Sequence, residues 1–328
     1  MLFIDNHNDT DPTINLAIEE YAVKHLDIDE TYLLFYINEP AIIIGKNQNT
    51  FEEINTEYVR EHGIHVVRRI SGGGAVYHDL GNLSFSFITR NDGNAFSNFR
   101  RFTEPVVDAL HQLGINAELT GRNDIQVGEK KISGNAQFAT KGRMFSHGTL
   151  MFDVDLNEVV NALQVRADKI ESKGIKSVRS RVANIREFLT EDMTIHEFRD
   201  KLLAYIFQGK SVPQYHLNEE DWSGIRELSK QKYRSWEWNF GKSPAFNVQR
   251  SHRFPIGSID VRLNVKDGLI ENCAIYGDFF GVEDVADIQE RFLGRRVQHS
   301  DLQEAIADLD LKQYFGNVTK EEFLSLFE

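Results

Sequence analysis

The chain has 328 residues, of which 41% are hydrophobic and 11% aromatic, enough for one large and one small folded domain. Its formal net charge of −13 argues against sequence-independent nucleic-acid binding, which needs a strongly positive surface. The single cysteine, Cys273, permits no intrachain disulfide and indicates a reducing compartment. We find no signal peptide and no apolar run long enough for a membrane span, so we expect a cytoplasmic protein with no nucleic-acid or membrane partner.

The first predicted elements are a helix and three strands. Asp11 is a suitable N-cap for a helix over residues 11–26, because a proline follows it and apolar residues then recur at helical spacing. Short β-branched and aromatic runs at residues 32–38 and 41–47 predict neighbouring strands, and residues 63–70 predict a third.

Beyond three consecutive glycines the sequence alternates regularly. Residues 82–88 alternate large apolar side chains with serine, which is typical of a strand buried on one face, so the glycine loop is expected to join two strands. Residues 99–113 predict a helix closed by a glycine. Residues 122–137 predict a hairpin that turns at Gly128, and a further strand is expected within residues 145–156.

Two more helices and an aperiodic stretch complete the first part of the chain. Residues 157–164 have a helical pattern, and residues 194–207 open on a capping box formed by Thr194 and Glu197. Periodicity is lost around residues 234–248, where glycine and proline indicate a linker.

A smaller folded part is expected after this linker. Residues 259–276 predict a hairpin with a two-residue Asp-Gly turn. Three short helices follow, and two of them have apparent capping boxes, which pair Ser300 with Gln303 and Thr319 with Glu322.

These elements predict an α/β (α+β) fold with two domains. The main domain, a mixed β-sheet with flanking helices, is expected over residues 1–243. A linker is expected at residues 244–247, and a small α+β accessory domain over residues 248–328.

The glycine loop is the first candidate site. Gly72, Gly73 and Gly74 expose bare backbone, whose N–H groups can approach an anion closely, and Arg68 and Arg69 suit bidentate contact with phosphate. The spacing is neither the P-loop pattern nor the dinucleotide fingerprint, and no helix follows. The alternative is a flexible connection, which would need fewer glycines and no arginine pair. We therefore predict an anion site.

The hairpin supplies the second candidate. Lys130 and Lys131 alternate across a strand, so one points to each face. The pattern does not choose between them, and the alternative is that both are solvated. The small polar residues 133–136 suggest another backbone that a ligand approaches closely.

Metal and nucleophile signals are weaker. No histidine or cysteine pair has the spacing of a zinc site. Asp79 and Asp124 could hold magnesium through oxygen, although each also suits a turn or a cap. Cys273 lies in the second predicted hairpin and is better explained by buried packing, and no Gly-x-Ser-x-Gly motif occurs, so covalent acyl-enzyme chemistry has no evident carrier.

Five ordered motifs together resemble one family. They are RRISGGGAVYHDLGN, GRNDIQVGEKKISGNAQ, SHGTLMFDVDL, KGIKSVRSRVANI and SWEWNFGKSPAF. In this combination and order, over most of residues 1–246, the chain closely resembles lipoate–protein ligase A in its two-domain bacterial form. The resemblance implies a main domain shared with biotin ligases and related to class II aminoacyl-tRNA synthetase cores.

The resemblance also implies a reaction in two steps. ATP activates the lipoate carboxylate to lipoyl-AMP with release of pyrophosphate, and a specific lysine of a lipoyl domain then attacks the acyl carbon. The implied partners are the apo lipoyl domains of 2-oxoacid dehydrogenase complexes and the glycine-cleavage H protein. ATP and Mg²⁺ would be required, with lipoate as substrate, and no tightly bound prosthetic group is expected.

Site residues carry over by motif. Lys131 matches the lysine of the family's K-[IV]-S-G motif and is the implied catalytic residue, placed to stabilise charge at the α-phosphate. Asp124, in the RND motif, is the implied magnesium ligand. Contacts to ATP and lipoyl-AMP are implied for Arg69, Ser71, Gly72, Gly73, Gly74, Ala75, Val76, Tyr77, His78, Asp79, Asn82, Asn123, Lys131, Gly134, Asn135, Ala136, His147 and Gly148.

The sequence differs from the family motifs at two positions, and it contains a basic stretch that could dock the lipoyl domain. Asn135 stands where a serine or another small residue is frequent in the family, and Ile70 precedes the serine before the glycines; neither change removes a charge. A basic docking face for an acidic lipoyl domain is expected at Lys173, Lys176, Arg179 and Arg181, with a solvated basic loop as the alternative.

Three rival functions are weighed against this one. An ATP-independent octanoyl or lipoyl amidotransferase of the same superfamily uses a cysteine in the main domain, and this chain has none there. Biotin ligase is disfavoured because its Gly-Arg-rich loop is absent. A non-catalytic lipoate-binding module is disfavoured by the intact Arg69, glycine loop and Lys131.

Overall fold

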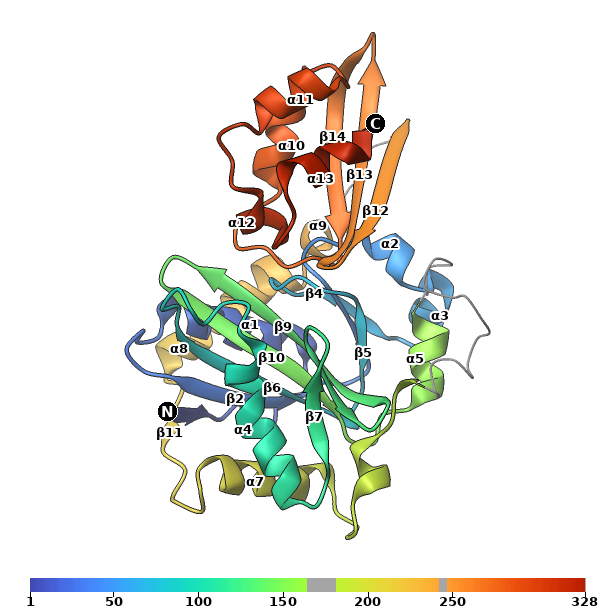
Figure 1. Ribbon diagram of the computed structural model, residues 1–328. Coiled ribbons are helices and arrows are strands. Elements are labelled where there is room, and N and C mark those ends of the chain that lie inside the picture. Colours follow the sequence, from blue (N-terminus) through green and yellow to red (C-terminus); the bar gives the residue numbers. More distant parts are fainter. Residues whose placement is uncertain (164–180, 242–246, 328) are drawn as a thin grey trace. The chain divides into compact units, whose positions relative to one another are not determined.

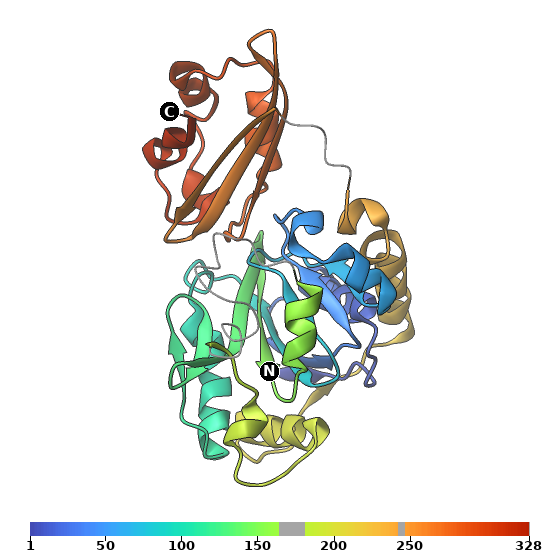
Figure 2. The same ribbon diagram turned by 90° about the vertical axis from the view of Figure 1, so that its right-hand side faces the viewer.

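The computed structural model describes residues 1–163, 181–241 and 247–327, and the chain forms two compact units (Figures 1 and 2). The first unit comprises Met1–Ile44, Thr50–Arg69 and Ala75–Asn239. The second comprises Gly45–Asn49, Ile70–Gly74 and Phe240–Glu328. Among the described helices, none is long and apolar enough to cross a membrane.

An eight-stranded mixed sheet forms the centre of the first unit (Figure 1). Its spatial order is β11 (Gln214–Tyr215), β1 (Leu2–Ile4), β2 (Tyr32–Ile37), β6 (Asn82–Arg90), β10 (Arg143–Met151), β9 (Lys130–Thr140), β8 (Asp124–Val127) and β7 (Ala117–Thr120). β1 runs parallel to β2 and β11, whereas the other neighbours are antiparallel. The predicted hairpin at Gly128 is therefore confirmed as β8 and β9.

Helices cover both faces of this sheet. On one face, α4 (Phe99–Gln112) places Phe102 beside Phe87 of β6, with ring centroids 6.2 Å apart, and α4 packs against α7 (Ile195–Ile206). On the other face, α1 (Pro12–His25) hydrogen-bonds to β10 and packs against α8 (Glu219–Leu228). The predicted starts of α1 and α7 are confirmed, because Asp11 caps α1 and Thr194 forms a capping box with Glu197.

Strand β6 differs from its prediction. It is buried on both faces, and Ser84 and Ser86 are as inaccessible as the apolar residues between them. The serines face α1, where Ser86 lies opposite His147 of β10 in the antiparallel register. The alternating serines of β6 therefore face a buried polar region and not solvent.

A second sheet of three strands carries the arginine pair. Its order is β4 (His65–Arg68), β3 (Ala41–Ile44) and β5 (Val76–His78). The expectation that residues 32–38 and 41–47 form neighbouring strands is wrong, because β1 and β6 occupy both edges of β2 and leave none for β3. The glycine loop joins β4 to the short β5, not directly to β6 as expected.

Short helices complete the first unit. They are α2 (Thr50–Glu53), α3 (Thr56–Glu61), α5 (Leu156–Ala162), the 3₁₀ helix η2 (Ile185–Phe188), the π-helix η3 (Ser229–Tyr233) and α9 (Trp236–Asn239). The first part of the stretch predicted to be a linker is therefore helical. Most of the predicted linker at 244–247 and the expected docking residues Lys173, Lys176 and Arg179 lie outside the described residues.

The second unit contains a three-stranded antiparallel sheet formed by β12 (Val248–Phe254), β13 (Gly257–Lys266) and β14 (Leu269–Gly277). The predicted turn between β13 and β14 is confirmed. Asp267 and Gly268 both have positive φ, 51° and 80°, as a two-residue type I′ connection requires. Apolar residues of β13 and β14 share a core with the helices that cover one face of this sheet (Figure 1).

The helices of the second unit correct two predictions. The described residues contain four α-helices here rather than three, namely α10 (Ala286–Phe292), α11 (His299–Ala305), α12 (Leu311–Phe315) and α13 (Lys320–Leu324), followed by the 3₁₀ helix η4 (Ser325–Phe327). Thr319 and Glu322 form the predicted capping box. Ser300 caps nothing, because α11 already begins at His299 and the Ser300 hydroxyl hydrogen-bonds to Asp301.

This difference between the two hydroxyl residues is testable. Replacing Thr319 by alanine should lower the free energy of unfolding of the second unit by about 1 kcal/mol, because the backbone N–H of Glu322 loses its acceptor. The matched change Ser300→Ala should alter it by less than about 0.5 kcal/mol. Urea denaturation followed by circular dichroism measures both, and equal losses would contradict the assignment of caps.

Candidate functional site

Arg69 is a buried cation at the end of β4. Its backbone N–H binds the carbonyl of Ile44 at 2.9 Å, and Nη1 donates to the carbonyl of Ile43 at 3.0 Å. Its side chain is 5% exposed. Burial lowers the pKa of Arg69 to about 10, while Tyr36 and Glu19 act to raise it, so the guanidinium remains charged at neutral pH.

A buried histidine and glutamate lie in the same unit. Nδ1 of His147, on β10, is 2.8 Å from Oε1 of Glu19, on α1, and both side chains are less than 10% exposed. His78, on β5, is also buried, and burial lowers its pKa to about 3, with smaller contributions from Arg69 and His147. These groups therefore form a polar interior between α1 and the two sheets.

Lys131 and Asp124 form a half-exposed ion pair on β9 and β8. Nζ of Lys131 lies 2.9 Å from Oδ1 of Asp124. The backbone carbonyl of Lys131 accepts from the N–H of Ala183 at 3.0 Å, which fixes the start of β9 from its other side. A Cβ at Gly134 would lie only 3.1 Å from Nζ of Lys131, so the missing side chain of Gly134 leaves room for the ammonium group.

Three sequence motifs interlock beside this pair. Asn135 donates from its backbone N–H and from Nδ2 to the carbonyl of Asn123, in both cases at 3.0 Å, and Nδ2 of Asn123 donates to the carbonyl of Asn135. Oδ1 of Asn135 lies 2.1 Å from where a Cβ of Gly148 would be. Glycine is therefore required at 148, and the RND, SGNA and HG motifs fit one another physically.

The remaining predicted residues of the first unit lie in or beside β5, β6 and β9. The two carboxylate oxygens of Asp79 accept from the backbone N–H groups of Gly81 and Asp155 at 2.8 and 2.9 Å, so Asp79 holds a turn. Asn82 donates to Ser84 at 3.1 Å. Ala75 and Val76 are half-buried, Tyr77 is buried with its pKa raised by burial, and Ala136 pairs with His147 in the sheet register.

Ser71 to Gly74 belong to the second unit, and packing explains part of their composition. A Cβ at Gly72 would lie 2.2 Å from the carbonyl oxygen of Phe279, and a Cβ at Gly45 would lie 1.9 Å from that of Gly73. Gly73 also has a φ of +92°. Close packing therefore accounts for Gly72 and the positive φ accounts for Gly73, while a Cβ at Gly74 would meet open space.

The loop containing Gly45 adds polar contacts within the second unit. The N–H of Lys46 binds the carbonyl of Ser71 at 2.9 Å, and the Lys46 ammonium lies 3.1 Å from Asp284. The carbonyl of Asn47 accepts from the N–H of Gly277 at 2.7 Å. These contacts join the segments Gly45–Asn49 and Ile70–Gly74 to the end of β14 and to Asp284 beyond it.

Helix α9 holds the open edge of β4. The backbone N–H of Arg68 donates to Oδ1 of Asn239 at 2.9 Å, and Nε1 of Trp238 donates to the carbonyl of Arg68 at 2.7 Å. The Arg68 guanidinium donates to the carbonyl of Trp238 at 2.9 Å and to Thr50 at 2.6 Å. Side chains of α9 thus replace a neighbouring strand at the residue just before Arg69.

Sequence reasoning missed several of these residues. Glu19 and Glu20 stand among apolar residues of α1 and are both 1% exposed, which was an available signal. Asn38, whose amide lies 3.0 Å from Nδ1 of His78, and Tyr36, which acts on Arg69, gave no local signal. Trp238 and Asn239 lie inside the quoted SWEWNFGKSPAF motif, but their contact with Arg68 bridges about half of the chain.

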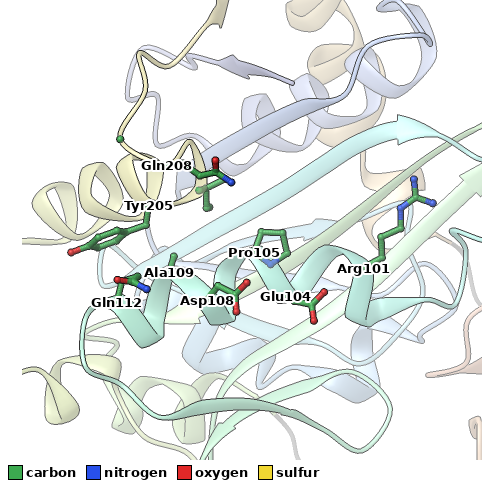
Figure 3. A pocket seen from close by; sticks show the side chains of 10 residues that line it. Arg101, Glu104, Pro105, Asp108, Ala109, Gln112, Tyr205 and Gln208 are labelled. Carbon is green, nitrogen blue, oxygen red and sulfur yellow. The ribbon is translucent and has the colours of Figure 1, made fainter.

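A groove between α4 and α7 lies elsewhere in the first unit (Figure 3). It has a volume of about 570 Å³, and its lining includes Glu104, Asp108 and Gln112 of α4 together with Tyr205 and Gln208 (Figure 3). It contains none of the predicted site residues. Within residues 1–163, 181–241 and 247–327, no group of three or more histidine, cysteine or acidic side chains could hold a metal ion.

Two family models match this chain. Residues 11–207 match the lipoyl protein ligase A/B catalytic domain, and residues 243–327 match the bacterial lipoate protein ligase C-terminus. The chain belongs to the lipoate–protein ligase family. Lipoate-protein ligase LplJ of Bacillus subtilis is 63% identical to this ligase over 329 residues, which cover 99% of each chain.

Two solved structures resemble this ligase. A bipartite lipoate protein ligase of Thermoplasma acidophilum, studied with its E2 lipoyl domain, is 34% identical, with a TM-score of 0.66, 75% of this chain and 98% of that chain covered. Lipoate-protein ligase A bound with ATP is 34% identical, with a TM-score of 0.62, 70% of this chain and 94% of that chain covered.

The contact between α9 and β4 predicts that two neighbouring tryptophans of α9 differ in their contribution to stability. Trp238→Phe removes the indole N–H and leaves the carbonyl of Arg68 without that donor, so stability should fall by about 1–3 kcal/mol. Trp236→Phe, at a side chain 46% exposed, should change it by less than about 0.5 kcal/mol. Urea denaturation measures both stabilities. Equal stability of the two variants would show that the carbonyl of Arg68, at the edge of β4, does not need the indole N–H as a hydrogen-bond donor.

Proposed function

We propose that this lipoate–protein ligase attaches lipoate to lipoyl domains in two chemical steps. In the first, a lipoate carboxylate oxygen attacks the α-phosphorus of ATP, and pyrophosphate leaves. In the second, the amine of a lysine on the lipoyl domain attacks the acyl carbon, loses a proton and displaces AMP. The observation that carries this proposal is the Lys131 ammonium, fixed between Asp124 and the bare backbone of Gly134.

Lys131 is the proposed catalytic residue. A fixed ammonium beside the reacting phosphate stabilises negative charge that grows at phosphorus and then on departing AMP. Asp124 keeps the ammonium in place before substrates arrive, since the two atoms are 2.9 Å apart. Holding the group in advance reduces the reorganisation that the reaction would otherwise need.

Arg69 and the polar interior are the proposed acyl side of the site. A buried guanidinium binds an anionic oxygen more strongly than an exposed one, because little water competes. His147, held by Glu19, is proposed as a wall of this region. Contacts to ATP and lipoyl-AMP are further proposed for Ser71, Gly72, Gly73, Gly74, Ala75, Val76, Tyr77, His78, Asp79, Asn82, Asn123, Gly134, Asn135, Ala136 and Gly148.

ATP use is supported by the related ligase whose structure holds ATP. Magnesium normally takes one or two carboxylates and completes its ligands with phosphate oxygens and water. Asp124 supplies one carboxylate, which fits an ion held mainly by the nucleotide. When bound, the ion would neutralise charge on the phosphates; Asp124 would be its protein ligand.

The lipoyl acceptor is supported by the Thermoplasma ligase, which was studied with its E2 lipoyl domain. We further propose the glycine-cleavage H protein as a second acceptor. Arg181 is the one member of the proposed basic docking stretch within the described residues, and its side chain is exposed. Its charge is suited to an acidic carrier surface.

Cysteine chemistry does not favour an amidotransferase. Cys273 lies on β14, and burial raises the pKa of its thiol to about 12, so at neutral pH almost no thiolate is available to attack an acyl group. ATP-dependent activation is therefore the proposed route.

An assay with an apo H protein tests this route. Incubation with lipoate, Mg²⁺ and ATP should add one lipoyl group to the intact mass, and omission of ATP should prevent it. Lys131→Ala should slow adduct formation about 10²–10³-fold, as expected for loss of a group that stabilises transition-state charge. An ATP-independent adduct from a lipoylated donor would instead establish a transferase.

Gly134 offers a finer test of how Lys131 is positioned. Gly134→Ala brings a methyl group to 3.1 Å from Nζ, so the ammonium must shift by a few tenths of an ångström. We expect lipoate-dependent ATP–pyrophosphate exchange to slow about tenfold, since small misplacements of a catalytic group are costly. In the Lys131→Ala background the same change should have no further effect, and an additive loss would contradict this role.

A further inference from the structure

A chain of buried asparagines leads from the loop before α1 to His78. Its first member, Asn6, has an unambiguous orientation because both ends of its amide bind backbone groups. Oδ1 accepts from the N–H of Asn8 at 3.2 Å, and Nδ2 donates to the carbonyl of Asp9 at 3.1 Å. Backbone groups have fixed donor and acceptor roles, so this amide cannot be turned over without losing both bonds.

The orientation of Asn6 fixes the orientation of the Asn15 amide. Nδ2 of Asn6 donates to Oδ1 of Asn15 at 2.8 Å. Nδ2 of Asn15 points to the carbonyls of Asp9 and Ile37 at 2.9 and 3.3 Å, and to Oδ1 of Asn38 at 2.9 Å. Asn38 must therefore present its oxygen to Asn15.

This arrangement decides which nitrogen of His78 carries the proton. With its oxygen facing Asn15, Asn38 presents Nδ2 to Nδ1 of His78 at 3.0 Å. An amide nitrogen only donates, so Nδ1 must accept. Because burial also holds the pKa of His78 near 3, the ring is neutral, and its single proton lies on Nε2.

Within the described part of the chain, the protonated nitrogen of His78 has no hydrogen-bond acceptor. His78 is 3% exposed, and Nε2 has no hydrogen-bond partner among the residues that the structure describes. A buried N–H without an acceptor is unfavourable and is rare in native proteins. A bound molecule that supplies an acceptor would relieve this cost.

We propose that Asn38 is a positioning residue, which fixes the Nε2–H tautomer of His78 so that this group donates a hydrogen bond to the lipoyl substrate. The inference rests on the proposed function for the identity of the substrate. Asn38 itself touches no ligand and acts only through His78. The acceptor is either a carboxyl oxygen or a sulfur of the dithiolane ring, both of which accept hydrogen bonds.

Asn38→Asp reverses the hydrogen bond while keeping the side-chain shape. A carboxylate in this place accepts a hydrogen bond, so the single proton of His78 moves to Nδ1. Nε2 then carries a lone pair instead of a proton, and this lone pair repels the acceptor atom of the ligand. We expect lipoate binding, measured by calorimetry without ATP, to weaken about tenfold or more. His78→Gln supplies an amide N–H near the Nε2 position, so Asn38→Asp should cause no further loss in that background.

Octanoate distinguishes the two acceptors, because it has the carboxyl group but no sulfur. Equal weakening for octanoate and lipoate identifies a carboxyl oxygen, and weakening for lipoate alone identifies a ring sulfur; both outcomes support the proposal. Unchanged binding of both by a folded Asn38→Asp protein would overturn it. Binding without ATP is independent of ligation, so failure of the proposed two-step reaction would be seen separately in the H-protein assay.

Nitrogen-15 NMR of the unaltered full-length protein provides a test that needs no variant. Long-range proton–nitrogen spectra should show His78 protonated at Nε2 alone, and the Nε2 signal should shift when lipoate is added. A proton on Nδ1, or an Nε2 signal unmoved at saturating lipoate, would overturn the proposal even if Asn38→Asp failed to fold.

Discussion

A guanidinium kept almost wholly out of water is the constraint on which the first unit depends. Burial of an unpaired charge is costly, so Arg69 requires hydrogen-bond acceptors and a nearby negative charge. Ile43 supplies a carbonyl at 3.0 Å, and Glu19 favours the charged form. Strand β3 and helix α1 must therefore approach the same point, which gives a physical reason for a buried glutamate at position 19 of α1.

The adjacent residues Arg68 and Arg69 have different roles. Arg68 turns toward α9, where Trp238 and Asn239 bind its backbone and receive its guanidinium. Arg69, one residue later, turns toward the polar interior. The edge of the three-stranded sheet is closed by side chains instead of another strand, and this closure fixes the backbone from which Arg69 projects.

Local signals were predictable from the sequence, whereas distant pairings were not. The cap at Asp11 and the Asp267-Gly268 turn depend on neighbours within a few residues, and both are confirmed. The alternation in β6 could not reveal that its serines face a polar interior, because solvent and buried polar groups favour the same residue type. In the site, Lys131 could be proposed from its motif, and Glu19 gave a signal because it stands among the apolar residues of α1. Asn38 gave no signal, because its partner His78 lies on a strand 40 residues away.

The most direct test of the proposed chemistry is a crystal structure with a non-hydrolysable analogue of lipoyl-AMP. Lys131 is expected to place Nζ within hydrogen-bond distance of the phosphate while Asp124 remains close, and Arg69 is expected to contact the acyl side of the ligand. An analogue bound away from Lys131, with the ammonium still held by Asp124 alone, would contradict the assignment of Lys131 as the catalytic residue.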